Sequence, residues 1–356
     1  MFINIKLTFS NLILNWYNNG HRNLPWRFTK DPYKVWLSEI ILQQTRITQG
    51  TAYYLKFVNT FPSIIDLANA DEKYVLKLWQ GLGYYSRARN LHKTAKFICE
   101  ELNGVFPKKY TEIIKLKGIG PYTAAAISSI CYSEKRAVVD GNVYRVLART
   151  HNIHTEINSN KGIKEFQYLA DQLISEKNPG DYNQGLMDLG ATICLPKKPK
   201  CNRCPVKKAC ESKEQEVAHH LPIKRKKKKP VRRNLNYLFI EGGQYFYMQK
   251  RIQNDIWKDL YDFPHTDEQL SDKDETPTVI EKLMEILPNK PFENLRTYQF
   301  IHHLSHQKLH ISITHVKTNN LLKNKNYILM NKKKLLNTPL PRPIELFFQE
   351  LERLID

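Results

Sequence analysis

Apolar residues recur at helical spacing through the first two thirds of the chain. Near the start these positions are Phe9, Leu12, Ile13, Trp16 and Tyr17. They predict an amphipathic helix, with Ser10 near its N-cap. A second helix is predicted to begin at Asp31–Pro32, because Asp is a favoured N-cap and Pro fits the first helical turn. Further helices are expected at residues 64–69, 74–79, 88–101, 111–115, 122–131, 143–150, 163–174 and 182–193. This part is therefore predicted to be mostly α-helical.

The pattern changes after a basic stretch. Residues 224–233 (KRKKKKPVRR) contain eight basic residues and nothing to bury, which indicates a solvated linker. Beyond it, two apolar runs at 237–240 and 245–248 flank a Gly-Gly pair, as in a β-hairpin. Strand-like alternation follows at Leu309, Ile311 and Ile313, and a closing amphipathic helix at Ile344, Phe347, Phe348, Leu351 and Leu354. We expect a helical domain over 1–220, a basic linker over 221–233 and an α/β domain over 234–356.

The charge balance narrows the class of partner. Lys and Arg number 55 against 35 Asp and Glu, which gives a formal net charge of +20 and an isoelectric point near 9.5. Nucleic acid is the commonest partner of such a chain, and the alternative explanation is a lysine-rich proteome. The sequence contains no lipidation motif, secretion signal or membrane-spanning run. We therefore expect a cytoplasmic protein with no membrane partner.

Four of the six cysteines fall within 17 residues, in the spacing C-x6-C-x2-C-x5-C. They are Cys194, Cys201, Cys204 and Cys210. Cytoplasmic thiols stay reduced, so this density predicts a metal site, and four thiolates suit a [4Fe–4S] cluster. A structural zinc site is the alternative, although it normally pairs two close knuckles and only Cys201 and Cys204 are that close.

Two carboxylates are candidates for acid–base chemistry. Glu39 shares the apolar face of the second predicted helix, where burial raises the pKa of a carboxyl group and suits a general acid. The alternative is a structural glutamate paired with Arg22 or Arg27. Asp140 follows an apolar run and enters a turn before a helix. The alternative there is that Asp140 or Asn142 only caps the helix, and we expect Asn142 to do so.

A glycine turn precedes Asp140 in the chain. Gly118 and Gly120 lie between two predicted helices, just before Tyr122. Glycines in such a turn let backbone N–H groups approach a phosphate at the start of the next helix. Many helix pairs use a glycine turn, so this signal gains weight only from its length and its position upstream of Asp140.

Longer motifs resemble a known family. They are LPWR at 24–27, VWLSEIILQQT at 35–45, GLGYYSRARNL at 81–91 and MDLGA at 187–191, together with the cysteine spacing. These segments resemble the endonuclease III superfamily of helix-hairpin-helix glycosylases and, within it, the adenine DNA glycosylases of the MutY family. The resemblance implies a mostly α-helical glycosylase region with a [4Fe–4S] cluster loop and a C-terminal α/β Nudix-like domain. It also implies a monomeric, nucleoid-associated base excision repair enzyme, which hydrolyses the N-glycosidic bond of adenine opposite 8-oxoguanine or guanine in duplex DNA.

The resemblance further implies roles for single residues. Glu39 resembles the acid that protonates adenine N7, and Asp140 the carboxylate that stabilises the sugar oxocarbenium ion. Tyr122 and Asn142 would support that site, and Gln184 lies where the family reads the adenine edge. Bifunctional relatives carry a lysine at the position of Tyr122, so here water is expected to complete the reaction.

Other matched residues are expected to contact DNA. Gln44 and Tyr84 resemble residues that insert into the base stack beside the opposing oxidised guanine. The remaining expected contacts are Arg22, Trp26, Arg27, Leu42, Gly118 and Gly120. Lys117 stands where the family's hairpin usually has proline, which adds a phosphate-facing charge.

The C-terminal domain resembles the family's Nudix-like domain, which recognises 8-oxoguanine. Leu304-Ser305-His306 resembles its Phe-Ser-His loop, so Ser305 and His306 are the candidate recognition residues. The alternative is a histidine-rich surface loop. The tryptophan-to-proline segment matches imperfectly, with Lys258 and Asp259 where glycines are usual. No Nudix hydrolase signature is present, so this domain is expected to bind nucleotides and not to hydrolyse them.

Two other functions fit some of these features. One is a bifunctional pyrimidine glycosylase/lyase of the endonuclease III type, against which Tyr122 and the extra domain argue. The other is a non-catalytic iron–sulfur DNA-binding regulator. Such a regulator does not need both Glu39 and Asp140 in matching contexts.

Overall fold

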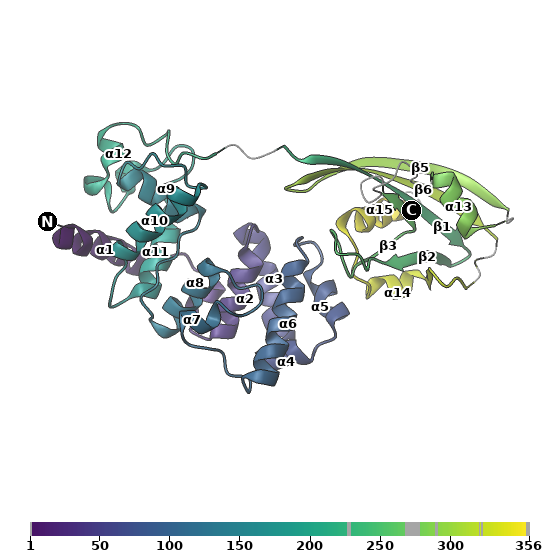
Figure 1. Ribbon diagram of the computed structural model, residues 1–356, viewed down its shortest axis with the longest axis horizontal. Coiled ribbons are helices and arrows are strands. Elements are labelled where there is room, and N and C mark those ends of the chain that lie inside the picture. Colours follow the sequence, from purple (N-terminus) through teal and green to yellow (C-terminus); the bar gives the residue numbers. More distant parts are fainter. Residues whose placement is uncertain are drawn as a thin grey trace. The chain divides into compact units, whose positions relative to one another are not determined.

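In a computed structural model, the chain divides into two compact units (Figure 1). The structure describes residues 2–225, 229–267, 278–288, 291–319, 321 and 323–353. The first unit comprises Met1–Asn69 and Asn90–Lys226, and the second comprises Ala70–Arg89 and Lys227–Asp356. No helix of the described residues is long and apolar enough to cross a membrane.

The helices follow the apolar periodicity. Each predicted helix from residue 31 to residue 193 is present, with ends that differ by at most three residues from the prediction. They are α2 (Pro32–Leu42), α4 (Ile64–Asn69), α5 (Glu72–Trp79), α6 (Ser86–Glu101), α7 (Tyr110–Ile113), α8 (Pro121–Tyr132), α9 (Gly141–Thr150), α10 (Asn160–Leu173) and α11 (Pro179–Thr192). The N-terminal helix α1 (Phe2–Asn18) is also present. Because it already begins at Phe2, Ser10 lies inside it, and the prediction that Ser10 is near its N-cap is wrong.

In the described helical region, four short elements and one longer helix, α3 (Ile47–Thr60), escaped prediction. The short ones are the 3-10 turns η1 (Pro25–Phe28), η2 (Cys201–Arg203) and η3 (Lys207–Ala209) and the helix α12 (Glu211–Glu214). Of the 14 residues of α3, only Gly50, Tyr54 and Phe57 are buried. An apolar stripe that thin does not stand out from the sequence.

Helices α2, α8, α9 and α11 form one packed group. Helix α2 packs on α8, and α11 packs on both α8 and α9. Glycines allow the close approach of α11, since a Cβ on Gly190 would lie 2.6 Å from the Cβ of Asn142 in α9. This packing brings the N-terminal turns of α8 and α9 close to the middle of α2.

The second unit contains a mixed sheet in the order β3-β2-β1-β6-β5, with β4 paired to β1 and β7 paired to β2. The strands are β1 (Val231–Gly242), β2 (Tyr245–Lys250), β3 (Tyr261–Asp262), β4 (His265–Asp267), β5 (Phe292–His303), β6 (Gln307–Thr318) and β7 (Ile328–Met330). β1 and β2 form the predicted hairpin, and β1 runs parallel to β6. Leu309, Ile311 and Ile313 of β6 are buried, which confirms the alternation predicted there.

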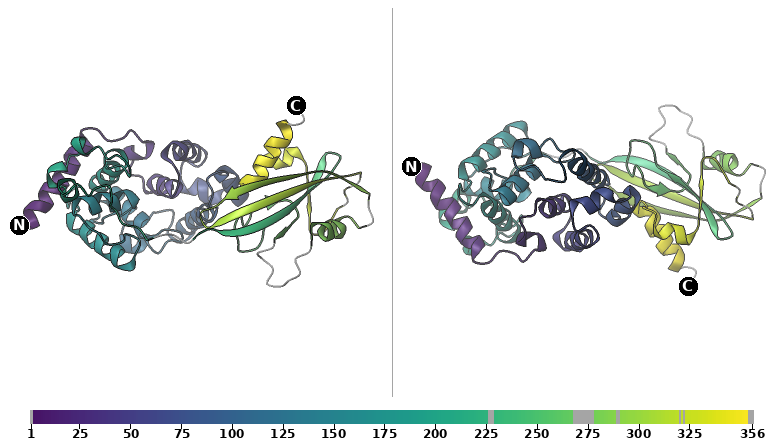
Figure 2. Two further views of the ribbon diagram at one scale, coloured as in Figure 1. Left: turned by 90° about the horizontal axis from the view of Figure 1, so that it is seen from above. Right: turned by 90° about the horizontal axis from the view of Figure 1, so that it is seen from below.

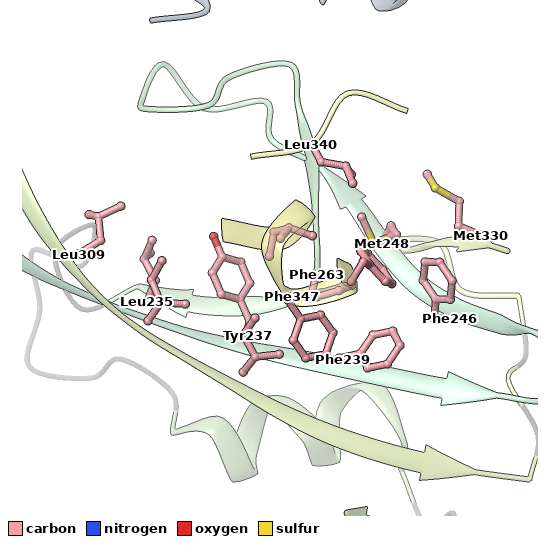
Figure 3. Close-up of a cluster of buried hydrophobic side chains, with 14 residues drawn as sticks. Leu235, Tyr237, Phe239, Phe246, Met248, Phe263, Leu309, Met330, Leu340 and Phe347 are labelled. Atoms are coloured by element: carbon pink, nitrogen blue, oxygen red, sulfur yellow. The ribbon is translucent and has the colours of Figure 1, made fainter. Parts of the chain in front are cut away.

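Apolar cores form on the two faces of this sheet. On one face, α15 (Arg342–Arg353) packs Phe347 against Tyr237 and Phe239 of β1 (Figure 3), and Leu335 of α14 (Lys332–Leu336) joins the same core. On the other face, α13 (Val279–Ile286) packs against Leu238 and Ile240. The closing helix is thus confirmed, although Leu354 of its predicted pattern lies outside the described residues. The predicted class, a mostly α-helical region followed by an α/β domain, is confirmed.

The predicted solvated linker at 224–233 is wrong at its C-terminal end. Val231, Arg232 and Arg233 already belong to β1, and residues 226–228 lie outside the described part of the chain. Arg233 is 3 % exposed, and its guanidinium forms ion pairs with Asp255 and Asp267. Basic composition alone does not identify such an arginine, because its carboxylate partners come from later in the chain.

Candidate active site

Glu39 lies on α2 in the apolar setting that its helix position predicts. The side chain of Asp31 accepts a hydrogen bond from the backbone N–H of Tyr33 (2.9 Å) and so starts this helix. Glu39 is 9 % exposed. Burial raises the pKa of its carboxyl group, while a hydrogen bond with the Tyr122 hydroxyl and the charge of Arg27 oppose the rise. Glu39 therefore retains a proton more readily than an exposed glutamate does.

Arg22 and Arg27 form their ion pairs with Asp188, not with Glu39. The Nη2 atom of Arg22 lies 2.5 Å from Asp188 Oδ1, and the Nη2 atom of Arg27 lies 2.9 Å from the same oxygen. Asp188 is almost fully buried on α11. The alternative explanation of Glu39, a structural glutamate paired with one of these arginines, is therefore wrong.

Asp140 is the N-cap of α9, so the expectation that Asn142 caps this helix is wrong. Asp140 Oδ1 accepts hydrogen bonds from the backbone N–H groups of Asn142 (2.9 Å) and Val143 (2.8 Å). The side-chain amide of Asn142 donates to Asp140 Oδ2 (2.9 Å). Burial raises the pKa of Asp140, and these donors oppose the rise by favouring the charged form. Capping and burial in a polar site thus occur together at this residue.

Tyr122 joins the two carboxylates. It lies in the first turn of α8, and its hydroxyl donates to Met187 Sδ (3.2 Å) and lies close enough to Glu39 for the two groups to shift each other's pKa. Burial raises the pKa of Tyr122 well above its usual value, and the charges of Glu39 and Asp140 add to the rise. Helices α2, α8 and α9 therefore bring an acid, a hydroxyl and a second carboxylate together. Gln184, also predicted for this site, is buried on α11.

A buried arginine that the sequence analysis missed supports Asn142. Arg145 Nη2 donates to Asn142 Oδ1 (2.9 Å) and to the carbonyl of Gly190 (2.6 Å), and its Nε donates to the carbonyl of Cys194 (2.6 Å). One side chain thus connects the start of α9, helix α11 and the first cysteine of the array. The available signal was a basic residue on the buried face of a predicted helix, one turn after Asn142.

The four cysteines of the array line a single cavity. Apolar residues of α9, α11 and the following loop line it as well. Arg149 Nη1 donates to Cys194 Sγ (3.4 Å) and to the carbonyl of Leu195 (2.7 Å), which fixes one side of the cavity. As the described residues stand, no three His, Cys, Asp or Glu side chains are grouped closely enough to hold a metal ion. Four thiols around one apolar cavity are nevertheless the donor set that a four-iron cluster takes.

The residues predicted to contact DNA in the first unit differ in exposure. Gln44 is exposed and has a left-handed backbone, with φ 58°. Gly118 has φ 79°, and a Cβ there would lie 2.6 Å from Asn90 Cβ, so the turn requires glycine; Gly120 is the N-cap of α8. Trp26 instead packs edge-on against Tyr54 and is buried.

In the second unit, Tyr84 and the predicted recognition loop line one open pocket. The Tyr84 hydroxyl donates to Ser305 Oγ, and Ser305 Oγ lies 3.4 Å from His306 Nδ1. Tyr84 is exposed and left-handed, with φ 47°. Trp257, the tryptophan of the tryptophan-to-proline segment, lines the same pocket. Asp259, where the family usually has glycine, has φ 67°, a conformation that glycine adopts without strain.

Comparisons with known proteins found two matching families and several similar proteins. The HhH-GPD superfamily of base excision DNA repair proteins matches residues 37–170, and the NUDIX domain family matches residues 236–350. An adenine DNA glycosylase of Buchnera aphidicola subsp. Schizaphis graminum is 39 % identical over 85 % of this chain and 86 % of its own length. That of Buchnera aphidicola subsp. Acyrthosiphon pisum is 35 % identical over 98 % of this chain and 99 % of its own. The structure of a thermostable thymine-DNA glycosylase, 32 % identical, superposes with a TM-score of 0.55 over 59 % of this chain and 97 % of that one.

Proposed function

Because the chain belongs to the adenine DNA glycosylases of base excision repair, we propose that Glu39 and Asp140 excise adenine mispaired with 8-oxoguanine or guanine in duplex DNA. The observation that carries this proposal is a pair of carboxylates, Glu39 buried and Asp140 partly buried, both close enough to Tyr122 to raise the pKa of its hydroxyl. Paired carboxylates serve glycosidic bond hydrolysis in general, one as an acid and the other beside the sugar cation.

The two carboxylates have different surroundings and so different roles. Glu39, raised in pKa by burial, donates its proton to N7 of adenine, and the C1′–N9 bond breaks as adenine leaves. Asp140, fixed by two backbone N–H groups and the Asn142 amide, stabilises the positive charge that develops on the sugar. Water adds to C1′ and loses a proton, which leaves an abasic site. Single-turnover adenine release by Glu39→Gln and Asp140→Asn variants tests the proposal, and both are expected to be inactive.

The presence of Tyr122 in place of a lysine predicts that the product strand is left intact at the abasic site. No amine occupies this position, so the enzyme is expected to leave abasic sites that break only when alkali is added. The measurement compares strand breaks on a denaturing gel with and without alkali treatment. Strand cleavage and borohydride trapping in neutral buffer, at the rate of adenine release, would contradict this expectation.

We propose that the four cysteines of the array bind a [4Fe–4S] cluster. The supporting observations are their shared cavity and the bond from Arg149 to Cys194 Sγ. When bound, such a cluster would hold together the loop that carries Lys197, Lys198 and Lys200, a cationic surface suited to the DNA backbone.

Metal content tests this assignment. Protein purified without oxygen or added zinc is expected to be brown and to contain about four irons per chain. Cys201→Ser is expected to lose iron and DNA affinity, whereas Cys99→Ser, a change outside the array, is expected to keep both. A colourless zinc protein with full activity would overturn the assignment.

We propose that the pocket of Tyr84, Ser305 and His306 recognises the base opposite adenine. Hydroxyl and imidazole groups can distinguish the edge of 8-oxoguanine from that of guanine, and an exposed tyrosine can stack in the duplex.

Gln44, exposed and left-handed, is proposed as a second inserting residue, and the glycine turn at Gly118 and Gly120 as a phosphate contact. Apart from the C-terminal end of the linker, where β1 already begins at Val231, the domain boundaries stated above are part of the same proposal, as is action as a monomer on chromosomal DNA.

Substrate discrimination tests the recognition pocket. Replacing Ser305 and His306 with Ala is expected to narrow the preference for A:8-oxoguanine over A:G by about 1–3 kcal/mol, the usual worth of one good base-edge contact. The measurement is the ratio of single-turnover rate over Kd for the two duplexes. Replacing the exposed His219 and His220 of the first unit with Ala is the control. Unchanged discrimination in the Ser305/His306 variant would count against the pocket.

A further inference from the structure

One face of the sheet in the second unit is polar over half its length. Along β1, even-numbered residues point away from the core with α15. At the far end these are Leu238 and Ile240, which pack against α13. Figure 2 shows α13 toward one end of the long strands. Toward the start of β1 the even positions are Arg232, Asn234 and Asn236, which are polar.

This polar half of the face forms an open groove across β1, β6 and β5. Its polar lining consists of Arg232, Asn234 and Asn236 from β1, His310 and Ser312 from β6, and Gln299 from β5. Among the described residues, no carboxylate lines it. The groove therefore presents mainly cationic, amide and hydroxyl groups, which are the groups that contact phosphate oxygens in protein–nucleic acid complexes.

A row of basic residues crosses the three strands at one end of the groove. Arg232 of β1 is in register with Lys308 of β6, which is in register with His303 of β5. The pKa of His310 is lowered by partial desolvation and, in addition, by the nearby charges of Arg232, Lys308 and His303. In the described part of the chain, neither Arg232 nor Lys308 forms an ion pair with a carboxylate. The next residue, Arg233, points to the opposite face and has two aspartate partners.

The basic row adjoins the recognition loop. Lys308 is two residues after His306 and His303 two before Ser305, so the row begins roughly 7 Å from the loop at the rise of a β-strand. At that separation the row is within reach of the phosphates of a duplex whose opposing base contacts Ser305.

We propose that this groove and the basic row at its end, chiefly through Arg232 and Lys308, bind the sugar–phosphate backbone of the substrate DNA next to the mispair. The inference rests on the proposed function, since it takes the recognition loop to lie at the opposing base. The charge of the protein indicates the kind of ligand. The formal net charge of +20 for the whole chain and the lack of carboxylates among the described residues that line the groove favour a polyanion such as DNA.

The salt dependence of DNA binding tests the groove. The probe is a duplex with an abasic site opposite 8-oxoguanine, which is the reaction product and is not turned over. Each phosphate contact contributes about 0.9 to the slope of log K against log salt concentration, so Arg232→Gln with Lys308→Gln is expected to flatten that slope by about two. At low salt the affinity is expected to fall roughly tenfold. A nearly isosteric Asn236→Asp variant, which places a carboxylate in the groove, is expected to weaken binding as well.

Lys332→Gln with Lys333→Gln is the matched control, because it removes two exposed charges at α14, whose Leu335 packs on the opposite face of the sheet. This control is expected to keep the wild-type slope. Equal slopes in the groove variant and the control, with thermal unfolding midpoints like that of the wild type, would overturn the inference. Wild-type excision measured on the same preparations separates the two claims: failure of the wild type to release adenine overturns the proposed function, whereas equal slopes overturn only the groove.

Discussion

Replacing Glu39 with Gln is expected to lower the single-turnover rate of adenine release by roughly 10²–10⁴-fold, the usual worth of a positioned general acid. The amide keeps the size of the side chain and an oxygen that can accept a hydrogen bond, so the packing of α2 is retained. What is lost is the proton for the leaving base. DNA affinity is expected to stay close to that of the wild type, because Glu39 is buried and has no positive charge with which to contact a DNA phosphate.

The pH dependence gives a second readout for Glu39. An acid must be protonated to act, so the rate is expected to fall as the pH rises above the pKa of Glu39. Burial raises that pKa, so this fall is expected at higher pH than for an exposed glutamate. The Gln variant is expected to show no such fall. A variant with a near-normal rate, or with the wild-type pH profile, would contradict the role of Glu39 as the acid.

Replacing Asp140 with Asn is expected to lower the rate by roughly 10²–10³-fold or more, because a fixed charge beside the developing cation is removed. The fold is expected to survive, since Asn is as good an N-cap as Asp and can accept the same bonds from Asn142 and Val143. The thermal unfolding midpoint should therefore stay near that of the wild type while excision is lost. This separates the catalytic role of Asp140 from its capping role.

Asp31→Asn is the matched control for this variant. Asp31 caps α2 in the same way but lies eight residues before Glu39, roughly 12 Å along the helix axis, so the identical chemical change there is expected to leave excision intact. Similar losses of rate in both variants would mean that helix capping, and not charge at the sugar, explains the effect of Asp140.

Most of the helical region could be predicted because its signals are local. The apolar repeat of α2 and the cap at Asp31 are each contained in a few neighbouring residues. The same holds for the cysteine spacing. The longest element that escaped prediction, α3, buries too few side chains to leave a periodic pattern in the sequence.

The ion pairs and the pocket that could not be predicted depend on residues far apart in the chain. In the sequence Arg233 belongs to a basic run that suggests a solvated segment. In the structure it is buried and forms ion pairs with Asp255 and Asp267. The sequence offered Arg22 and Arg27 as possible ion-pair partners of Glu39, whereas in the structure both arginines pair with Asp188. The pocket shared by Tyr84 and Ser305 joins segments about 220 residues apart, which no local pattern reports.

The most direct test of the account is single-turnover release of the base from duplexes containing A:8-oxoguanine, A:G, A:T or an oxidised pyrimidine, analysed with and without alkali. The account predicts rapid release of adenine opposite 8-oxoguanine, slower release opposite guanine, little release from A:T or of the oxidised pyrimidine, and strand breaks only after alkali. Release of the oxidised pyrimidine with strand cleavage in neutral buffer, or no release of adenine from any duplex, would contradict it.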